Sequence, residues 1–457
     1  MPPWHADALV IFGAGGDLAA KMLYPALLGL VRQSRLAAPV IGVGRTAWDT
    51  ACFVAYVRES ILAAEVDVDN ATFEALSRLL QYIDGDLRSP ETLNKLRRAL
   101  GAAQHPLYYL AIPPELFAVA VEGMRAIGGV AGARLAVEKP FGHDLASARD
   151  LDAKLHSVLD EPAIFRVDHF LAKWPVRNLL HFRSANAIVE ALWSGKHIRS
   201  VQITMAEAFG VGTRGSFYDR VGALRDVVQN HLLQIVALLA MEAPTAADSE
   251  TMHASRIKLL ESIRPAKSAQ IVRGQYSGYQ EIDGVAPASD TETFVALRLG
   301  IDSPRWRGVP FFIRAGKELP LTTTEAWIEL KPPARRLYPG TPEHFRLRLG
   351  PGKVDIGVGI SVGEPAAGTR AISIEPEADL GRDQDRDAYE RLLGDALRGD
   401  RTVFERSDAI MAEWRIVDPL LREPPRVELY TPGTWGPTTA DRILTRGDRW
   451  HDPVPMP

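Results

Sequence analysis

A cluster of glycines directly after the first apolar segment limits most strongly how this chain can fold. The apolar run Ala8–Phe12 is followed by Gly13-Ala14-Gly15-Gly16-Asp17-Leu18, which opens the helical stretch Leu18–Ser34. Glycines at such a turn let the backbone approach a pyrophosphate, whose charge the helix N-terminus stabilises. This order predicts the start of a dinucleotide-binding domain. The candidate cofactor residues here are Gly13, Gly15, Gly16, Asp17 and Leu18.

Apolar segments alternate with helical stretches up to about residue 170. The next expected strands are Val40–Val43, Leu80–Ile83, Leu107–Ala111 and Arg134–Val137, and the expected helices are Asp49–Ala64, Pro90–Gly101 and one from Pro114. Uniformly apolar strands separated by helices indicate a parallel sheet that is buried on both faces. This is the doubly wound Rossmann arrangement.

After about residue 180 the pattern changes to alternating polar and apolar residues. It is found in Ser200–Ala206, Thr291–Leu299, Glu325–Leu330, Glu343–Leu349 and Val354–Val362. A period of two is typical of a mostly antiparallel sheet with one solvated face, and the helical stretches Ala223–Met241 and Asp387–Leu397 would cover the other face. We predict an α/β Rossmann domain over residues 1–172 and a larger α+β domain over residues 173–457.

Charge and composition argue against several classes of protein. A net charge of −4 gives no general electrostatic footprint for nucleic acid or membranes. The chain lacks both a long apolar span and a basic N-terminal segment, so we expect a cytoplasmic protein. The single cysteine, Cys52, excludes an internal disulfide framework and a cysteine-built zinc site. Its apolar neighbours predict that it is buried.

The end of the second strand bears on cofactor choice. An acidic residue there favours NAD, whereas an arginine accommodates the 2′-phosphate of NADP. The strand ends in Val43-Gly44-Arg45-Thr46, so Arg45 indicates NADP unless it is simply a solvated surface arginine. Pro113, at the end of the fourth strand, would lie near the cofactor's ribose or would only terminate the strand.

Three polar segments suggest the chemistry: Glu138–Gly142, Arg166–Lys173 and Leu224–His231. Hydride loss from an alcohol requires a base for the hydroxyl proton, and a histidine oriented by a buried carboxylate suits that role. Asp168 and a histidine from another segment would form such a dyad. His169 and His231 are both candidates, and either could instead be a structural histidine.

Taken together, the motifs resemble the glucose-6-phosphate dehydrogenase family. They are GxxGDL (Gly13–Leu18), VGxGR ending at Arg45, EKPFG (Glu138–Gly142), RVDHFLxK (Arg166–Lys173), LRDVVQNHLLQ (Leu224–Gln234), RGQY (Arg273–Tyr276), TETFVA (Thr291–Ala296), VPFFIRAGK (Val309–Lys317), DAYERLL (Asp387–Leu393) and GTWGP (Gly433–Pro437). The resemblance covers nearly the whole chain in the family's order. It implies oxidation of β-D-glucose 6-phosphate with NADP, the entry reaction of the pentose phosphate pathway, with no metal. It also implies a homodimer or homotetramer made through the second sheet.

The resemblance also implies roles for individual residues. His231 is the base and Asp168 its carboxylate partner, while His169 and Lys173 hold the substrate phosphate. Lys139 lies between substrate and nicotinamide, and Pro140 adjusts the angle between the domains. The remaining substrate contacts are Glu207, Asp226 and Lys317.

Several positions depart from the family pattern. Phe170, Ala172 and Trp174 replace the usual tyrosine, glycine and glutamate, and Phe170 cannot give a hydroxyl to the phosphate. Thr322 stands where the family usually has a second basic residue. The segment Leu349-Gly350-Pro351-Gly352-Lys353 stands where the family has a glutamine, in a strand that ends IQPDE, and is one residue shorter. In the cofactor site, Gly15 and Met22 replace polar or basic residues, so use of NAD as well as NADP is an open alternative.

Three hypotheses follow from these observations. The first is a working dehydrogenase of glucose 6-phosphate. The second is a C1 dehydrogenase of a related sugar or sugar phosphate, suggested by Phe170, Thr322 and Gly350. The third is a non-catalytic regulatory paralogue, which is disfavoured because Asp168 and His231 both remain.

Overall fold

The computed structural model describes residues 5–246, 248–335, 342–351, 354–362, 370–374, 377–378 and 384–455. The chain divides into two compact units. The first comprises Met1–Lys173, Ala246–His253 and Asp383–Met411, and the second comprises Trp174–Thr245, Ala254–Arg382 and Ala412–Pro457. The predicted single boundary after residue 172 stays a prediction; the first compact unit also includes two later segments of the chain. No helix among the described residues combines the length and apolar character needed to cross a lipid bilayer.

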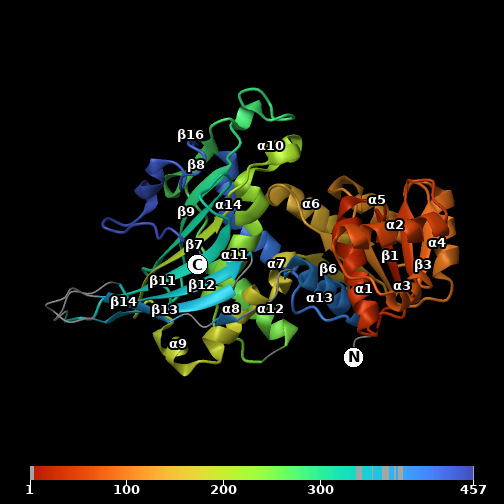
Figure 1. Ribbon diagram of the computed structural model, residues 1–457, viewed down its shortest axis with the longest axis horizontal. Helices are drawn as coiled ribbons and strands as arrows, with labels where there is room; N and C mark the ends of the chain where they lie inside the picture. Colours follow the sequence, from red (N-terminus) through yellow and green to blue (C-terminus); the bar gives the residue numbers. More distant parts are fainter. Residues whose placement is uncertain are drawn as a thin grey trace. The chain divides into compact units, whose positions relative to one another are not determined.

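The first unit is built on a six-stranded parallel sheet with the order β3-β2-β1-β4-β5-β6 (Figure 1). The strands are β1 (Ala8–Phe12), β2 (Val40–Gly44), β3 (Leu80–Asp84), β4 (Pro106–Leu110), β5 (Arg134–Glu138) and β6 (Ile164–Val167). The helices are η1 (Ala19–Leu23), α1 (Tyr24–Arg32), α2 (Thr50–Ala63), α3 (Asn70–Ser77), α4 (Pro90–Leu100), η2 (Pro114–Leu116), α5 (Phe117–Ala126), α6 (Leu145–His156), η3 (Glu161–Ala163), α7 (His169–Ala172) and α13 (Gln384–Arg398). The predicted Rossmann fold is confirmed.

Side chains alternate between two apolar layers along the strands of this sheet. On β1, Leu9 and Ile11 pack with α1, α2, α3 and α13, whereas Val10 and Phe12 pack with α4, α5 and α6. These strands are uniformly apolar because helices cover both faces of the sheet. One layer is completed by α13, which begins more than two hundred residues after β6.

The second unit contains a ten-stranded sheet in which only two described strand pairs, β7–β10 and β8–β16, are parallel. The strands are β7 (Ile198–Ala206), β8 (Ile271–Tyr276), β9 (Phe294–Gly300), β10 (Pro310–Gly316), β11 (Thr323–Leu330), β12 (His344–Gly350), β13 (Val354–Val362), β14 (Arg370–Ile374), β15 (Glu377–Ala378) and β16 (Val427–Tyr430). Its helical segments are α8 (Trp174–Ser184), α9 (Ala187–Leu192), η4 (Gly212–Arg214), α10 (Gly215–Ala223), η5 (Leu224–Leu232), α11 (Leu233–Ala240), η6 (Ser268–Gln270), η7 (Tyr279–Glu281) and η8 (Thr438–Ile443). Two more helices, α12 (Ser249–Ser262) and α14 (Ser407–Arg422), contribute residues to both units. The predicted mostly antiparallel sheet is confirmed.

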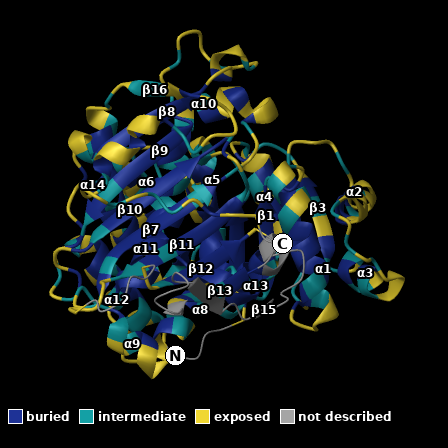
Figure 2. Cartoon of the chain, turned by 60° about the vertical axis from the view of Figure 1, so that its left-hand side comes forward, coloured by how far each residue is buried: buried dark blue, intermediate teal, exposed yellow. Residues whose placement is uncertain are grey.

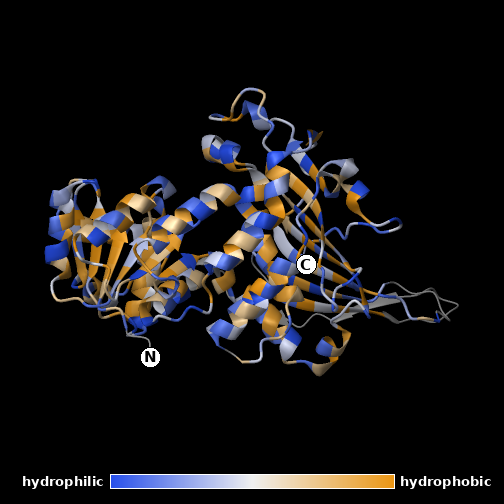
Figure 3. Ribbon diagram, turned by 180° about the vertical axis from the view of Figure 1, so that it is seen from behind, coloured by the Kyte–Doolittle hydropathy of each residue, from blue (hydrophilic) through white to orange (hydrophobic). Residues whose placement is uncertain are grey.

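Burial follows the strands of this sheet more closely than its loops. Figure 2 shows β7, β10 and β11 mostly buried, and Figure 3 shows apolar residues along the sheet strands of each unit. The C-terminal segment packs on the sheet through polar contacts. Arg314 binds Asp452 at 2.8 Å, and Trp327 stacks on His451 with a centroid separation of 3.7 Å. The segment that carries His451 and Asp452 is therefore part of the second unit's structure.

Cys52 is exposed, so the expectation that it is buried is wrong. It lies on α2, whose buried residues are Phe53, Val57, Ser60 and Ile61. These four positions follow the helical repeat and form the face that packs on the sheet. Cys52 falls outside that face, so its apolar sequence neighbours did not indicate its burial.

Candidate functional site

A hollow of about 800 Å³ lies at the carboxyl ends of the first four strands of the first unit. Its lining residues are Gly13, Gly15, Gly16, Val43, Gly44, Arg45, Thr46, Gly85, Asp86, Leu87, Arg88, Ala111, Ile112, Pro113, Glu115 and Leu116. Among the candidate cofactor residues, Gly13, Gly15, Gly16, Arg45 and Pro113 therefore share one hollow. Asp17 and Leu18 follow it at the start of the helical stretch. Ligands bind at this edge of open α/β sheets.

Gly13 has a conformation and a position that exclude a side chain. Its φ is +84°, and a Cβ there would lie 2.2 Å from the carbonyl oxygen of Ala111. A Cβ on Gly15 would instead meet Thr46 and Trp48 at 3.5–3.6 Å, which is ordinary contact. The chain therefore needs glycine at residue 13 to make the turn, whereas the free protein has space for a side chain at residue 15.

Arg88 also lines the hollow, although the sequence did not single it out. It follows β3, and β3 pairs with β2, the strand that leads to Arg45. Two basic residues thus border the same part of the hollow. The available signal was positional, because carboxyl ends of adjacent parallel strands lie at one edge of the sheet.

Two segments of the first unit carry the predicted catalytic and phosphate-binding residues. Lys139 follows β5 directly, and its peptide bond to Pro140 is cis. Asp168 follows β6, is 2% exposed and accepts a hydrogen bond from the Phe170 N–H at 3.0 Å, which caps α7. His169 and Lys173 lie at the two ends of this short helix. Since β5 and β6 are adjacent parallel strands, both segments leave the same edge of the sheet.

Glu138, the last residue of β5, is a buried carboxyl group behind this edge. It accepts a hydrogen bond from the Tyr109 hydroxyl at 2.5 Å and another from Tyr389 on α13. Tyr389 also stacks on His169, with ring centroids 5.9 Å apart and planes inclined by 14°. Burial raises the pKa of Glu138 to about 7, although the two tyrosines and the charge of Lys139 oppose the shift. Glu138 therefore titrates near neutral pH, beside residues assigned to the substrate.

The raised pKa of Glu138 predicts a pH-dependent loss of stability. Because the folded group keeps a proton that the unfolded chain has released, its contribution is fully present below the unfolded pKa and is lost as pH rises toward 7. Glu138→Gln should remove on the order of 2–3 kcal/mol of this pH dependence between pH 5 and pH 8. Unfolding at pH 5 and pH 8 measures the effect. The exposed control Glu59→Gln should keep the parent's pH slope, and an equal slope in Glu138→Gln would contradict the prediction.

In the second unit, Glu207 and Lys317 meet because their strands are parallel. Ala206 on β7 is the register partner of Gly316 on β10, so each next residue leaves the sheet at the same edge. The Lys317 ammonium group donates a hydrogen bond to the Glu207 carboxylate. Lys317 also lies 5.4 Å and 5.0 Å from the ring centroids of Phe209 and Tyr218. The lysine is thereby held in a fixed direction.

His231 and Asp226 lie on η5, which is a π-helix rather than part of the single helix expected over Ala223–Met241. Its start is anchored by the buried Glu292, which accepts a hydrogen bond from the Leu224 N–H at 3.0 Å. Arg273 holds the same carboxylate at 2.8 Å. π-helical turns are rare and are often found at functional sites. Sequence periodicity did not predict this one, because its apolar residues also fit an α-helix.

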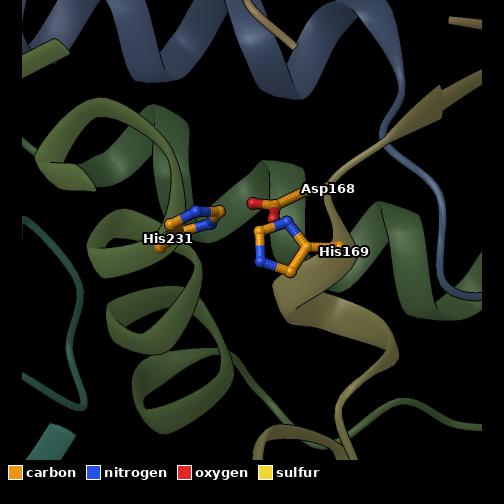
Figure 4. A group of neighbouring side chains, drawn as sticks. All are labelled: Asp168, His169 and His231. Carbon is orange, nitrogen blue, oxygen red and sulfur yellow. The ribbon is translucent and has the colours of Figure 1, made fainter. Parts of the chain in front are cut away.

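His231 is 5% exposed, and its backbone N–H donates a hydrogen bond to the Asn230 side-chain oxygen at 2.7 Å. Figure 4 shows Asp168 and His169 at the junction of β6 and α7, and His231 on η5. The first two belong to the first unit and His231 to the second. The pairing of Asp168 with His231 is therefore part of the proposed mechanism.

Comparisons with known proteins cover nearly all of the chain. Residues 10–178 match the family described as glucose-6-phosphate dehydrogenase, NAD binding domain, and residues 180–451 match its C-terminal domain. The chain is 44% identical to glucose-6-phosphate 1-dehydrogenase 1 of Mycobacterium tuberculosis, over 98% of this chain and 97% of that protein. The chain belongs to the glucose-6-phosphate dehydrogenase family.

Other members of the glucose-6-phosphate dehydrogenase family agree with this assignment. The enzyme of Aggregatibacter actinomycetemcomitans is 37% identical, with 97% of both chains covered. The crystal structure of the Mycobacterium avium enzyme matches with a TM-score of 0.93 and 42% identity over 99% of this chain and all of that one. A structure of glucose-6-phosphate dehydrogenase in complex with its substrate glucose 6-phosphate matches with a TM-score of 0.89 and 30% sequence identity. The match covers 98% of this chain and 100% of that chain. The predicted family is therefore confirmed.

The structure gives local contacts for some departures from the glucose-6-phosphate dehydrogenase pattern. Phe170 is buried, and the Lys173 ammonium group lies 5.2 Å from its ring centroid. The Thr322 hydroxyl accepts a hydrogen bond from the Ala208 N–H at 2.9 Å, next to Glu207. Met22 packs against the apolar layer of the first unit. Gly350 ends β12, whereas Gly352 and Lys353 lie outside the described residues.

Proposed function

We propose that this chain oxidises β-D-glucose 6-phosphate at C1 to 6-phosphoglucono-1,5-lactone and reduces NADP to NADPH. The observation that carries the proposal is 44% identity to a curated glucose-6-phosphate 1-dehydrogenase along almost the full length of both chains. The family's reaction residues also stand at their motif positions. This would be the entry reaction of the pentose phosphate pathway.

Two buried side chains perform the proton transfer. His231 takes the proton of the C1 hydroxyl, and Asp168 orients the imidazole and stabilises the imidazolium that forms. The sugar would lose a proton to His231 and a hydride, which carries two electrons, from C1; a bound nicotinamide would accept the hydride. Both side chains are almost fully buried. Electrostatic stabilisation is most effective in such a site, from which water is excluded.

The other residues bind and orient the substrate. His169 and Lys173 hold its phosphate, while Glu207, Asp226 and Lys317 contact the sugar. Lys139 would lie between the sugar and a bound nicotinamide. The Glu207–Lys317 ion pair supports the assignment, because an acceptor and a donor fixed side by side suit neighbouring hydroxyl groups.

The hollow of the first unit is proposed to hold the dinucleotide. Gly13 makes the tight turn against Ala111, and a glycine-rich turn of this kind lets a pyrophosphate approach the backbone. When bound, the nicotinamide supplies the hydride acceptor. Arg45 supports NADP over NAD.

A substrate panel tests the proposal against its alternative, a C1 dehydrogenase of a related sugar. The alternative is favoured by Phe170, which has no hydroxyl for a phosphate, and by Thr322, whose hydroxyl is hydrogen-bonded to the backbone. Initial rates with glucose 6-phosphate, glucosamine 6-phosphate, galactose 6-phosphate and glucose should be highest for the first. A higher kcat/KM for another sugar would support the alternative. Inactivity on all four with tight nucleotide binding would support a regulatory paralogue.

We also propose a homodimer or homotetramer made through the second sheet and a cytoplasmic location. The proposed assembly is supported by the family resemblance. Light scattering coupled to size exclusion should give twice or four times the chain mass, and a monomer at micromolar concentration would contradict it.

A further inference from the structure

The two arginines of the nucleotide hollow lie on neighbouring strands. β2 and β3 are parallel, Gly44 is the register partner of Asp84, and the Gly85 N–H donates to the Gly44 carbonyl at 2.8 Å. Arg45 and Arg88 follow these two strand ends, and both line the hollow. The fold therefore brings together two basic residues that are 43 positions apart in sequence.

The loop that carries Arg45 is fixed by contacts within the first unit. The Tyr82 hydroxyl donates to the Thr46 carbonyl at 3.0 Å, and Trp48 packs on Tyr56 and Tyr82 with centroids 4.6 Å and 5.6 Å apart. A guanidinium group on a loop that is already ordered loses less conformational entropy when it binds an anion.

Arg88 keeps most of its side chain accessible to a ligand. Its backbone N–H donates to the Asp86 carboxylate at 2.9 Å, but its guanidinium lies 3.9 Å from that carboxylate. The Arg88 side chain is 67% exposed. An ion pair this long and this exposed is weak, so an incoming phosphate can replace it.

Charge is distributed unevenly along the hollow. Arg45 and Arg88 border it at β2 and β3 together with one carboxylate, Asp86, which leaves a net positive charge there, whereas Glu115 borders it beyond β4. In the sheet order β3-β2-β1-β4 these are opposite ends. The basic end suits a phosphate group, and the acidic end suits the cationic ring of an oxidised nicotinamide.

We propose that Arg88 acts with Arg45 as a specificity-determining pair for the 2′-phosphate of NADP. This inference rests on the proposed function only in placing a dinucleotide in the hollow. Arg88 supplies a second guanidinium in a chain that has Gly15 and Met22 in place of polar or basic residues. Two guanidinium groups bind a dianionic phosphate with directed hydrogen bonds that a 2′-hydroxyl cannot accept in the same way.

Equilibrium titration of the full-length protein with NADPH and NADH, without sugar, tests the pair separately from catalysis. Arg88→Ala should raise the Kd for NADPH roughly tenfold to a hundredfold and leave that for NADH within about twofold. Arg125→Ala on α5 is the control, because Arg125 is similarly exposed at 62% but does not line the hollow. Arg88→Lys should restore part of the affinity, since it keeps the charge without the planar fork.

Several outcomes would overturn the assignment. Equal weakening of both nucleotides would place Arg88 on the pyrophosphate or adenine, and an unchanged Kd would make it a solvated side chain. Parent protein that binds neither nucleotide would refute the hollow as a cofactor site. Specific NADPH binding with no turnover of glucose 6-phosphate would leave the pair standing and refute the proposed reaction.

Discussion

Replacing His231 by asparagine is expected to lower kcat by on the order of a thousandfold, because asparagine cannot accept the C1 hydroxyl proton. Since His231 is buried on η5 and asparagine is polar and smaller, the fold should be retained. KM for the sugar phosphate should change only a few-fold, because the phosphate is assigned to other residues. Steady-state rates and thermal unfolding measure the two effects. A kcat within tenfold of the parent would remove His231 from the role of base.

Two comparisons separate chemistry from packing. The control His181→Asn, on the surface of α8, should leave kcat unchanged. Asp168→Asn keeps an oxygen that can still accept the Phe170 N–H and cap α7, so it removes mainly the negative charge. If Asp168 acts through His231, the double variant should be no slower than His231→Asn alone. Losses that multiply would mean that the two residues act independently.

Replacing Gly13 by valine is expected to abolish tight binding of either nucleotide and to destabilise the first unit. The Cβ would lie 2.2 Å from the Ala111 carbonyl oxygen and 3.0 Å from the Ile112 side chain, and φ is +84°. Valine strongly disfavours this φ, so the turn must shift. A displacement of about 1 Å at such a site can lower kcat/KM on the order of a hundredfold.

Gly15→Ala is the matched control for Gly13→Val. Its Cβ would make only ordinary contacts with Thr46 and Trp48, so the free energy of unfolding should change by less than about 0.5 kcal/mol. Thermal unfolding and nucleotide titration of both variants give the comparison. Parent-like stability and affinity in Gly13→Val would show that the turn is not under the steric restriction seen in the structure.

The first sheet was predictable from the sequence because each of its central strands is a continuous apolar run. Buried parallel strands such as Val40–Gly44 are apolar throughout, and the intervening helices separate them clearly. The small helix Asn70–Ser77 was not expected, because only Phe73 and Leu76 are buried in it. Short helices of this kind give too few periodic positions to recognise.

Features that depend on distant partners were not predictable. The π-helical turn at His231 depends on Glu292, which is about sixty residues later and satisfies its first N–H group. Arg88 lies near Arg45 only because β2 and β3 pair in the folded sheet. Glu138 was seen as part of a motif, but its burial between Tyr109 and Tyr389 requires the assembled layer.

The position of α13 in the first unit bears on how the chain folds during translation. Ala388, Tyr389 and Leu392 complete the same apolar layer as Leu9 and Ile11, although the ribosome makes them near the end of synthesis. Until they emerge, part of that face of the N-terminal sheet is exposed to water. The nascent first unit therefore stays incomplete while most of the second unit is being made. A chain that stops between β6 and α13 would expose this apolar face. It would be an aggregation-prone intermediate rather than an independent nucleotide-binding module.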